Sequence, residues 1–175
     1  GGNTAPPDTK GTPTVVFGRV VDTAGKPIAN ATLDVWQANS SGLYDQQLPD
    51  PSKIHMRGIF TTGSDGQFVV RTTRPVAYQI PTDGPVGRML QATKRHSWRP
   101  AHTHFVVAAP GHEGVTTHIF DSTDPYLKSD AVFGVKESLI VEFQPHQPGD
   151  AAAQRFGMTT PFLTAEFDFV LKPVN

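Results

Sequence analysis

The sequence contains no cysteine. Disulfide bonds, zinc sites built from thiolates and thiol nucleophiles are therefore excluded, which leaves His, Tyr, Asp and Glu as possible metal ligands. No run of about 18 apolar residues is present, so we expect no membrane-spanning helix. The net charge is −1 and the basic residues are scattered, so we expect neither nucleic acid nor a membrane surface as a partner.

Uninterrupted stretches long enough for extended helices are also lacking, because 16 glycines and 16 prolines punctuate 175 residues. Short runs rich in Val, Ile, Phe and Thr lie between them, and residues 163–169 alternate between apolar and polar in the clearest period-two run of the chain. This pattern predicts an all-β fold. We expect an antiparallel β-sandwich with long loops and at most one or two short helices, one of them over residues 86–92.

The chain is long enough for one domain with one core. We expect residues 1–13, which include Pro6-Pro7, to form a lead-in or linker, and residues 14–175 to form the sandwich. The sequence starts at Gly1 without Met, which indicates a processed product or an excised piece with a leader or further domain removed. The sequence does not determine the cellular compartment, and it weakly favours secretion.

Two β-hairpins are expected. In the first, the turn GSDG joins two short strands, and in the second a PGHEG turn does the same. Other strands follow from β-rich runs bounded by turn residues. In order, the expected strands are 14–22, 31–37, 58–62, 67–72, 101–108, 115–120, 137–143 and 163–171.

The strand at 101–108 carries His102 and His104. Successive side chains of a strand point to opposite faces, so these two imidazoles project on the same side, one pleat apart. Two neutral imidazoles in that arrangement can bind one metal ion. The alternative, to which we give equal weight, is that the two histidines bind no metal and only form hydrogen bonds on a polar strand face.

Only three tyrosines are present, and Tyr44 and Tyr78 both follow strand ends. Loops there could bring them to the histidine pair, which would make a site of two His and two Tyr. A phenol has a pKa of about 10, so binding as phenolate at neutral pH favours a hard, highly charged ion such as Fe(III). For either tyrosine alone, ring packing at the surface is the commoner role.

Three longer segments contain these residues: DVWQANSSGLY at 34–44, YQIPTDGPVG at 78–87 and RPAHTHF at 99–105. In this order they closely resemble the intradiol ring-cleaving dioxygenases. The likeness extends from about residue 16 to residue 143, and DAVFGVK at 130–136 is most similar to the hydroxyquinol and catechol branch.

The resemblance implies a β-sandwich that binds non-haem Fe(III) and uses O2 to cleave a catechol-type diol between its hydroxylated carbons, giving a cis,cis-muconate-type diacid. It also implies that Tyr78 leaves the metal to take up a substrate proton, and that Arg99 stabilises negative charge on the ring. The metal ligands that it implies are Tyr44, Tyr78, His102 and His104.

The sequence departs from the family pattern in four ways. His118 stands where relatives usually have Gln, and we expect it to keep a catalytic hydrogen-bonding role. Gln79 replaces Pro, which could loosen the loop carrying Tyr78, and Thr103 replaces Ile. The N-terminal helical dimerisation segment is absent from this sequence, so we expect a monomer.

Two other functions fit parts of the sequence. A non-enzymatic sandwich module, prealbumin-like or carbohydrate-binding, would explain the first forty residues but not Tyr78 or residues 99–104. A zinc or ferrous His-x-His enzyme would need a carboxylate ligand, for which no position is convincing. We expect loop or surface roles, and ordinary turn chemistry for the aspartate, for the remaining candidates: His55, His96, His112, His146, Tyr126 and Asp130.

Overall fold

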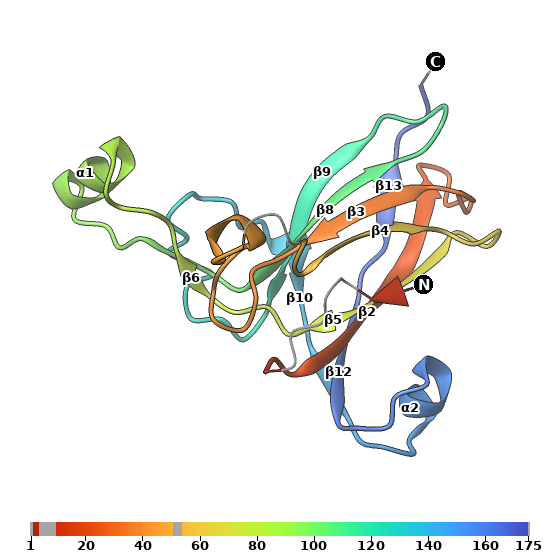
Figure 1. The fold of residues 1–175 in the computed structure, drawn as a ribbon. Helices are drawn as coiled ribbons and strands as arrows, with labels where there is room; N and C mark the ends of the chain where they lie inside the picture. Colours follow the sequence, from red (N-terminus) through yellow and green to blue (C-terminus); the bar gives the residue numbers. More distant parts are fainter. Residues whose placement is uncertain (1, 4–9, 51–53, 175) are drawn as a thin grey trace.

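The computed structural model describes residues 2–3, 10–50 and 54–174, which fold into two β-sheets packed face to face (Figure 1). The first sheet contains, in spatial order, β1 (Gly2–Asn3), β5 (Gln67–Thr73), β2 (Pro13–Asp22), β12 (Phe162–Glu166) and β11 (Gln144–His146), with β13 (Phe169–Leu171) also paired to β2. The second contains β10 (Ile140–Val141), β9 (Val115–Asp121), β8 (His102–Ala108), β3 (Thr32–Trp36) and β4 (Arg57–Thr61).

Several small elements lie outside the two sheets. Figure 1 shows α1 on an arm that projects from the sandwich, next to the short pair of β6 and β7. Their bounds are β6 (Tyr78–Gln79), β7 (Trp98–Arg99), α1 (Pro85–Ala92), α2 (Ala151–Phe156) and the 3-10 turns Asp45–Gln47 and Glu137–Leu139. In the part of the chain that the structure describes, no helix combines the length and apolar character needed to cross a membrane.

The core lies between the sheets and is built from alternate residues of each strand. Leu33 and Val35 of β3 and Phe105 and Val107 of β8 are fully buried there. Burying such a side chain contributes about 1.5–3 kcal/mol, so the registers of β3 and β8 are strongly specified. The opposite face of β8 is thereby left for polar side chains.

The expected all-β sandwich with two short helices is confirmed. The expected hairpin of residues 101–108 and 115–120 is present as β8 and β9, and the expected helix at 86–92 is α1. The lead-in expected over residues 1–13 falls mostly outside the described residues. Of its described parts, Gly2–Asn3 pair with β5, and Pro13 begins β2.

The sheets of the sandwich are mixed rather than antiparallel throughout. Four strand pairs run parallel: β1 with β5, β10 with β9, and both β12 and β13 with β2. An apolar-polar alternation reports only which face of a strand is buried, and it is the same for either direction of the neighbouring strand. Strand direction therefore could not be read from the period-two pattern.

The expected hairpin of residues 58–62 and 67–72 was wrong. The turn between them forms, with Gly63 N donating to Gln67 O over 3.0 Å, but β4 pairs with β3 and β5 pairs with β2. The chain therefore crosses from one sheet to the other at this turn. Phe60 and Phe68 both reach the core, one from each sheet, and burying both rings favours the crossing over a flat hairpin.

The strand expected over residues 163–171 is divided into β12 and β13. Between them Asp168 accepts hydrogen bonds from the backbone N–H of Arg19 (2.7 Å) and from its guanidinium (2.9 Å), so a side chain replaces the ladder bond. The strand expected over 137–143 is likewise shorter. Its first part forms the 3-10 turn Glu137–Leu139, and only Ile140–Val141 pair with β9.

A buried glutamine links the two sheets near β8. Gln37 is 1% exposed, and its Nε2 donates to the backbone oxygen of Thr73 on β5 over 2.9 Å. The hydroxyl of Thr103 on β8, which is also buried, donates to Gln37 Oε1 over 2.9 Å. This polar bridge holds the end of β8 that carries the two histidines at a set distance from the opposite sheet.

The close approach of β2 to the chain between β12 and β13 yields a test. A methyl group at Gly18 would overlap the carbonyl oxygen of Phe167, so we expect Gly18→Ala to lower the free energy of unfolding by about 1–3 kcal/mol. Urea denaturation measures this. The control is Gly84→Ala, whose methyl group has no neighbour within 4 Å; equal stabilities of the two variants would contradict the packing.

The glutamine bridge yields a second test. Thr103→Val leaves Gln37 Oε1 buried without a donor, so we expect it to cost about 1–3 kcal/mol of unfolding free energy. In a Gln37→Met background the acceptor is gone, and the same threonine change should cost less than about 0.5 kcal/mol. Urea denaturation of the four proteins gives the coupling, and a coupling near zero would refute the bridge.

Candidate metal and catalytic site

Four side chains from three segments meet on the polar face of β8. His102 Nε2 lies 3.0 Å from His104 Nε2, and His104 Nε2 lies 3.1 Å from the Tyr44 hydroxyl. The Tyr44 hydroxyl in turn donates to the Tyr78 hydroxyl over 3.1 Å. Two nitrogen and two oxygen donors therefore follow one another at hydrogen-bond distance, and they come from the four residues that the sequence indicated as metal ligands.

Local structure places the two tyrosines. After β3, the side-chain oxygen of Asn39 accepts from the backbone N–H of Ser41 and Leu43, and this turn leads directly to Tyr44. Tyr78 lies on β6, where it pairs with Arg99 of β7. The loop expected to be loosened by Gln79 is thus held by strand pairing, since Gln79 pairs with Trp98.

The two histidines are oriented by different contacts. His102 Nδ1 lies 2.6 Å from the Pro100 carbonyl oxygen, which only accepts hydrogen bonds, so Nδ1 carries the proton and Nε2 presents its lone pair to the site. The ring of His104 stacks on Trp36, with centroids 4.8 Å apart and planes 4° from parallel. Both rings are therefore held with Nε2 toward the tyrosines.

Burial sets the protonation of these groups. Desolvation, together with the charge of Arg99, lowers the pKa of His102 well below its usual value. Desolvation, with His118 and Arg99, lowers the pKa of His104 to about 4, so both rings are neutral at pH 7. Burial and the neighbouring Tyr78 raise the pKa of Tyr44, so only a strong Lewis acid would bind it as phenolate.

The donor set fits a single metal ion. Two ring nitrogens and two phenol oxygens follow one another at separations of 3.0–3.1 Å, close enough for neighbouring donors to contact one ion. Among the described residues, no three His, Cys, Asp or Glu side chains gather to hold a metal. An ion at this site would therefore need the tyrosine oxygens, as a hard trivalent cation does.

Arg99 borders the donors. Its side chain is buried, its Nη1 lies 3.1 Å from His102 Nε2, and its Nε donates to Asp130 Oδ1 over 3.1 Å. Burial alone would lower the pKa of Arg99, but the hydrogen bond and charge of Asp130, with Tyr78, raise it on balance. A permanent cation with few solvent contacts thus faces the four donors.

His118 lies on β9 directly opposite His104. Its Nε2 is 3.4 Å from Arg99 Nη2, and its ring packs edge-on against Phe120 at 4.5 Å between centroids. Desolvation and the charge of Arg99 lower its pKa. His118 therefore borders both the guanidinium and the donor cluster.

The other candidates lie apart from the donors. Tyr126 stacks on Trp98 with centroids 5.2 Å apart, which confirms the expected role in loop packing. His96 lies 2.9 Å from the Ser129 hydroxyl, and His146 lies 2.8 Å from that of Thr164. His112 Nδ1 lies 3.0 Å from the carbonyl oxygen of Pro110.

Sequence reasoning missed two contributors to the site. Asp130 was expected to act only in a turn, yet it is buried and paired with Arg99, 31 residues earlier. Trp36 was expected only as a strand residue, and it supports the His104 ring. The spacing along the chain gave no sign of either contact, because both depend on which strands and loops become neighbours.

Comparison with known proteins bears on the family and the fold. The family model described as Dioxygenase matches residues 3–173. The chain is 48% identical to a hydroxyquinol 1,2-dioxygenase of Rhizobium sp., covering 94% of this chain and 56% of that protein. It is 38% identical to an intradiol ring-cleavage dioxygenase of Aspergillus niger, covering 94% of this chain and 49% of that protein. The chain thus spans about half the length of these relatives.

Solved structures give the same result. The hydroxyquinol 1,2-dioxygenase from Pseudomonas putida DLL-E4 superposes with a TM-score of 0.91 at 47% identity, covering 99% of this chain and 61% of that chain. The catechol 1,2-dioxygenase from Acinetobacter sp. ADP1 superposes with a TM-score of 0.90 at 32% identity, covering 99% of this chain and 57% of that chain. The chain therefore belongs to the intradiol ring-cleavage dioxygenase family.

Proposed function

We propose that the chain is the catalytic unit of a non-haem Fe(III) enzyme that cleaves small aromatic diols between their hydroxylated carbons with O2. The observation that carries this proposal is the convergence of two tyrosine oxygens and two histidine nitrogens at 3.0–3.1 Å spacing beside a buried arginine. Hydroxyquinol is the first substrate to test, since relatives at 48% and 47% identity act on hydroxyquinol and on 6-chlorohydroxyquinol. Catechol is the second.

The residues that would hold the ion are Tyr44, Tyr78, His102 and His104. When bound there, Fe(III) would act as a Lewis acid that withdraws electron density from the diol and makes its ring carbon reactive toward O2. The neutral imidazoles supply two nitrogens without adding charge, and the two phenolates would offset part of the charge of the ion.

Tyr78 is the residue proposed to move a proton. Its hydroxyl lies at one end of the row of donors, accepts from the Tyr44 hydroxyl over 3.1 Å and also interacts with Arg99. β6 and β7 are a separate pair of two-residue strands, so Tyr78 is carried by a segment other than β8. We assign to the phenolate oxygen that Tyr78 would have as a ligand the uptake of one proton from a substrate hydroxyl, which leaves Tyr78 as a neutral phenol.

Arg99 and His118 line the place where the diol would bind. The guanidinium remains charged without gaining or losing a proton, so it stabilises negative charge that develops on the ring carbon as it reacts. His118 Nε2 lies 3.4 Å from the guanidinium, so its hydrogen bond helps to orient that group and the substrate. Overall, one O2 is consumed per diol, and both oxygen atoms enter the cis,cis-muconate-type diacid.

The two other functions considered lose support. A non-enzymatic module has no use for four buried or half-buried metal donors on one strand face. A zinc or ferrous enzyme would need a carboxylate beside the histidines, and within the described residues no such cluster of His, Asp and Glu occurs. The domain bounds of 14–175 and the monomeric state stay predictions, and sedimentation equilibrium tests the latter.

The first prediction concerns the tyrosine ligands. Iron-loaded protein should show a broad visible band from charge transfer between tyrosinate and Fe(III), and Tyr44→Phe should remove most of it because one donor oxygen is lost. Absorption spectra at equal iron content measure this. Tyr126→Phe, which alters a ring stacked on Trp98, should keep the band. An unchanged band in Tyr44→Phe would refute the ligand assignment.

A second prediction concerns the arginine. Arg99→Ala should keep the visible band while lowering kcat by roughly 10²–10³-fold, the usual effect of removing a group that stabilises charge in the transition state. Oxygen uptake with hydroxyquinol and catechol measures kcat. Arg19→Ala, which breaks the ion pair with Asp168 at the surface, is the control and should leave kcat unchanged. Normal turnover in Arg99→Ala would exclude the proposed role.

A further inference from the structure

We propose that Asp130 is a positioning residue for this reaction: its carboxylate fixes the Arg99 guanidinium and also holds the loop of residues 130–134 against it. The inference rests on the proposed function. Within the described part of the chain, the Asp130 carboxylate hydrogen-bonds to Arg99, Val132 and Gly134 and to none of the four donors, so it acts through Arg99 and the loop.

The contact with Arg99 is buried and has two points. Arg99 Nε donates to Asp130 Oδ1 over 3.1 Å, and Arg99 Nη2 approaches Oδ2 at 3.4 Å. The aspartate is 3% exposed and the arginine 7%. Two nearly parallel contacts restrict both the position and the plane of a guanidinium, which a single contact does not.

The same carboxylate organises the loop. Oδ1 accepts from the backbone N–H of Val132 at 3.3 Å, and Oδ2 accepts from that of Gly134 at 2.8 Å. Phe133 N donates to the Asp130 carbonyl over 3.1 Å, and Phe133 has a positive φ of 56°. A non-glycine residue in that conformation is costly, so the loop needs the hydrogen bonds of Asp130 to keep its shape.

The loop closes directly onto the arginine. A methyl group built on Gly134 would lie 3.0 Å from Arg99 Nη2 and 3.0 Å from His118 Nε2. The backbone of Gly134 therefore lies against the guanidinium, and a methyl group there would push the guanidinium or the His118 ring aside by a few tenths of an ångström. Asp130 thus restricts the position of Arg99 in two ways, by its own carboxylate and through the backbone of Gly134.

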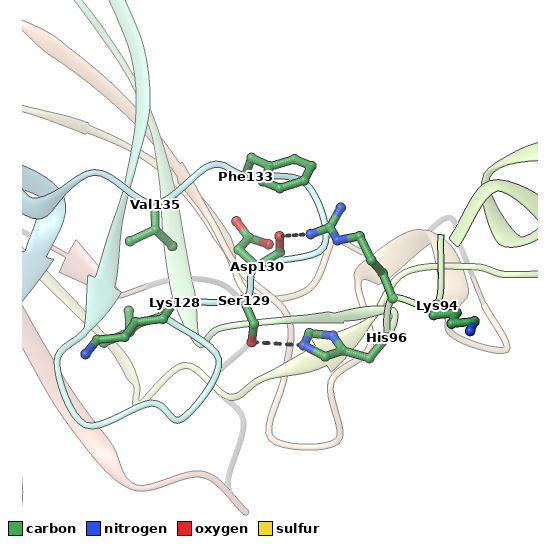
Figure 2. A pocket seen from close by; sticks show the side chains of 9 residues that line it. Lys94, His96, Lys128, Ser129, Asp130, Phe133 and Val135 are labelled. Atoms are coloured by element: carbon green, nitrogen blue, oxygen red, sulfur yellow. Dashed lines mark hydrogen bonds between the residues drawn. The ribbon is translucent and has the colours of Figure 1, made fainter. Parts of the chain in front are cut away.

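Other hydrogen bonds also hold the loop: Arg95 donates to the carbonyl oxygens of Asp130 (2.8 Å) and Ala131 (3.3 Å), and Ala131 N donates to Trp98 O over 3.0 Å. Figure 2 shows Asp130 between Phe133 and Ser129 at a cavity of about 470 Å³. Phe133 is 78% exposed, and its ring is covered on one side by the guanidinium of Arg95, 3.8 Å from the centroid. The side chain of Phe133 therefore adds little packing, and the hydrogen bonds of the Asp130 carboxylate and of Arg95 fix the position of the loop. Further residues that line the cavity are Lys94, His96, Leu127, Lys128 and Val135.

Positioning of this kind should affect turnover more than substrate binding. A guanidinium released from Asp130 keeps its charge but samples several rotamers, so it is correctly placed only part of the time. Small misplacements of a group that stabilises a transition state cost about 10–100-fold in rate. Diol binding depends mainly on the metal donors, which Asp130 does not contact.

The test is a double-mutant cycle on iron-loaded protein. Asp130→Asn keeps the shape of the side chain and removes its charge. We expect it to lower kcat about 10–100-fold in the wild-type background but less than about 2-fold in an Arg99→Ala background, where nothing remains to be positioned. Anaerobic titration with catechol, followed by the visible band, should give a Kd within about 3-fold of wild type.

A matched control is Asp121→Asn. Asp121 is also buried, accepts from an arginine (Arg74 Nε, 2.7 Å) and from a loop N–H (Thr123, 3.0 Å), but does not contact Arg99. We expect it to lower stability with a kcat near that of wild type. If Asp130→Asn does not fold, Gly134→Ala takes its place in the cycle, because its methyl group displaces the same guanidinium.

Three outcomes would overturn the positioning role: a kcat within about 2-fold of wild type, an equal loss in both backgrounds, or loss of the visible band and of catechol binding. The last would indicate a general structural role. Failure of the proposed function is separate, because iron-loaded wild-type protein would then consume no oxygen with either diol. Turnover by wild type together with an unaffected Asp130→Asn rejects the positioning inference alone.

Discussion

The site depends on the register of a single strand. In β8, Thr103, Phe105 and Val107 are buried between the sheets, so the alternate residues His102 and His104 must lie on the opposite face. A shift of one residue would expose the core phenylalanine and bury both imidazoles in hydrocarbon. The free energy of core burial, which far exceeds that of any single contact in the site, therefore also fixes the direction in which the two imidazoles point.

Around that strand face, the neutral metal-binding groups and the charged groups are different residues. Burial keeps His102 and His104 neutral by lowering their pKa values, so their lone pairs are available at neutral pH. The positive charge beside them is carried by Arg99, and a buried carboxylate compensates it on the side away from the donors. A cation can thus stay in a desolvated pocket without an uncompensated charge.

The sequence predicted the residues of the candidate site better than it predicted the contacts between them. The tyrosine and histidine donors were found because they lie in segments with a strong family resemblance, and the structure brings them together from positions up to 60 residues apart. Asp130 was underestimated because Asp in a loop is usually turn chemistry. Asp130 does form such a turn, because its carboxylate accepts from the backbone N–H of Val132 and Gly134. It also pairs with Arg99, which lies on another segment.

The amino-acid sequence by itself determined the β-rich class, the short helix α1, the hairpin of β8 and β9 and the face on which the histidine pair lies. All of these follow from local periodicity and turn residues. Only the tertiary structure decided that β4 and β5 belong to different sheets, that β12 and β13 run parallel to β2, and that Asp130 meets Arg99. The physical reason is that strand partners and buried ion pairs are chosen by the shared core, which no short segment contains.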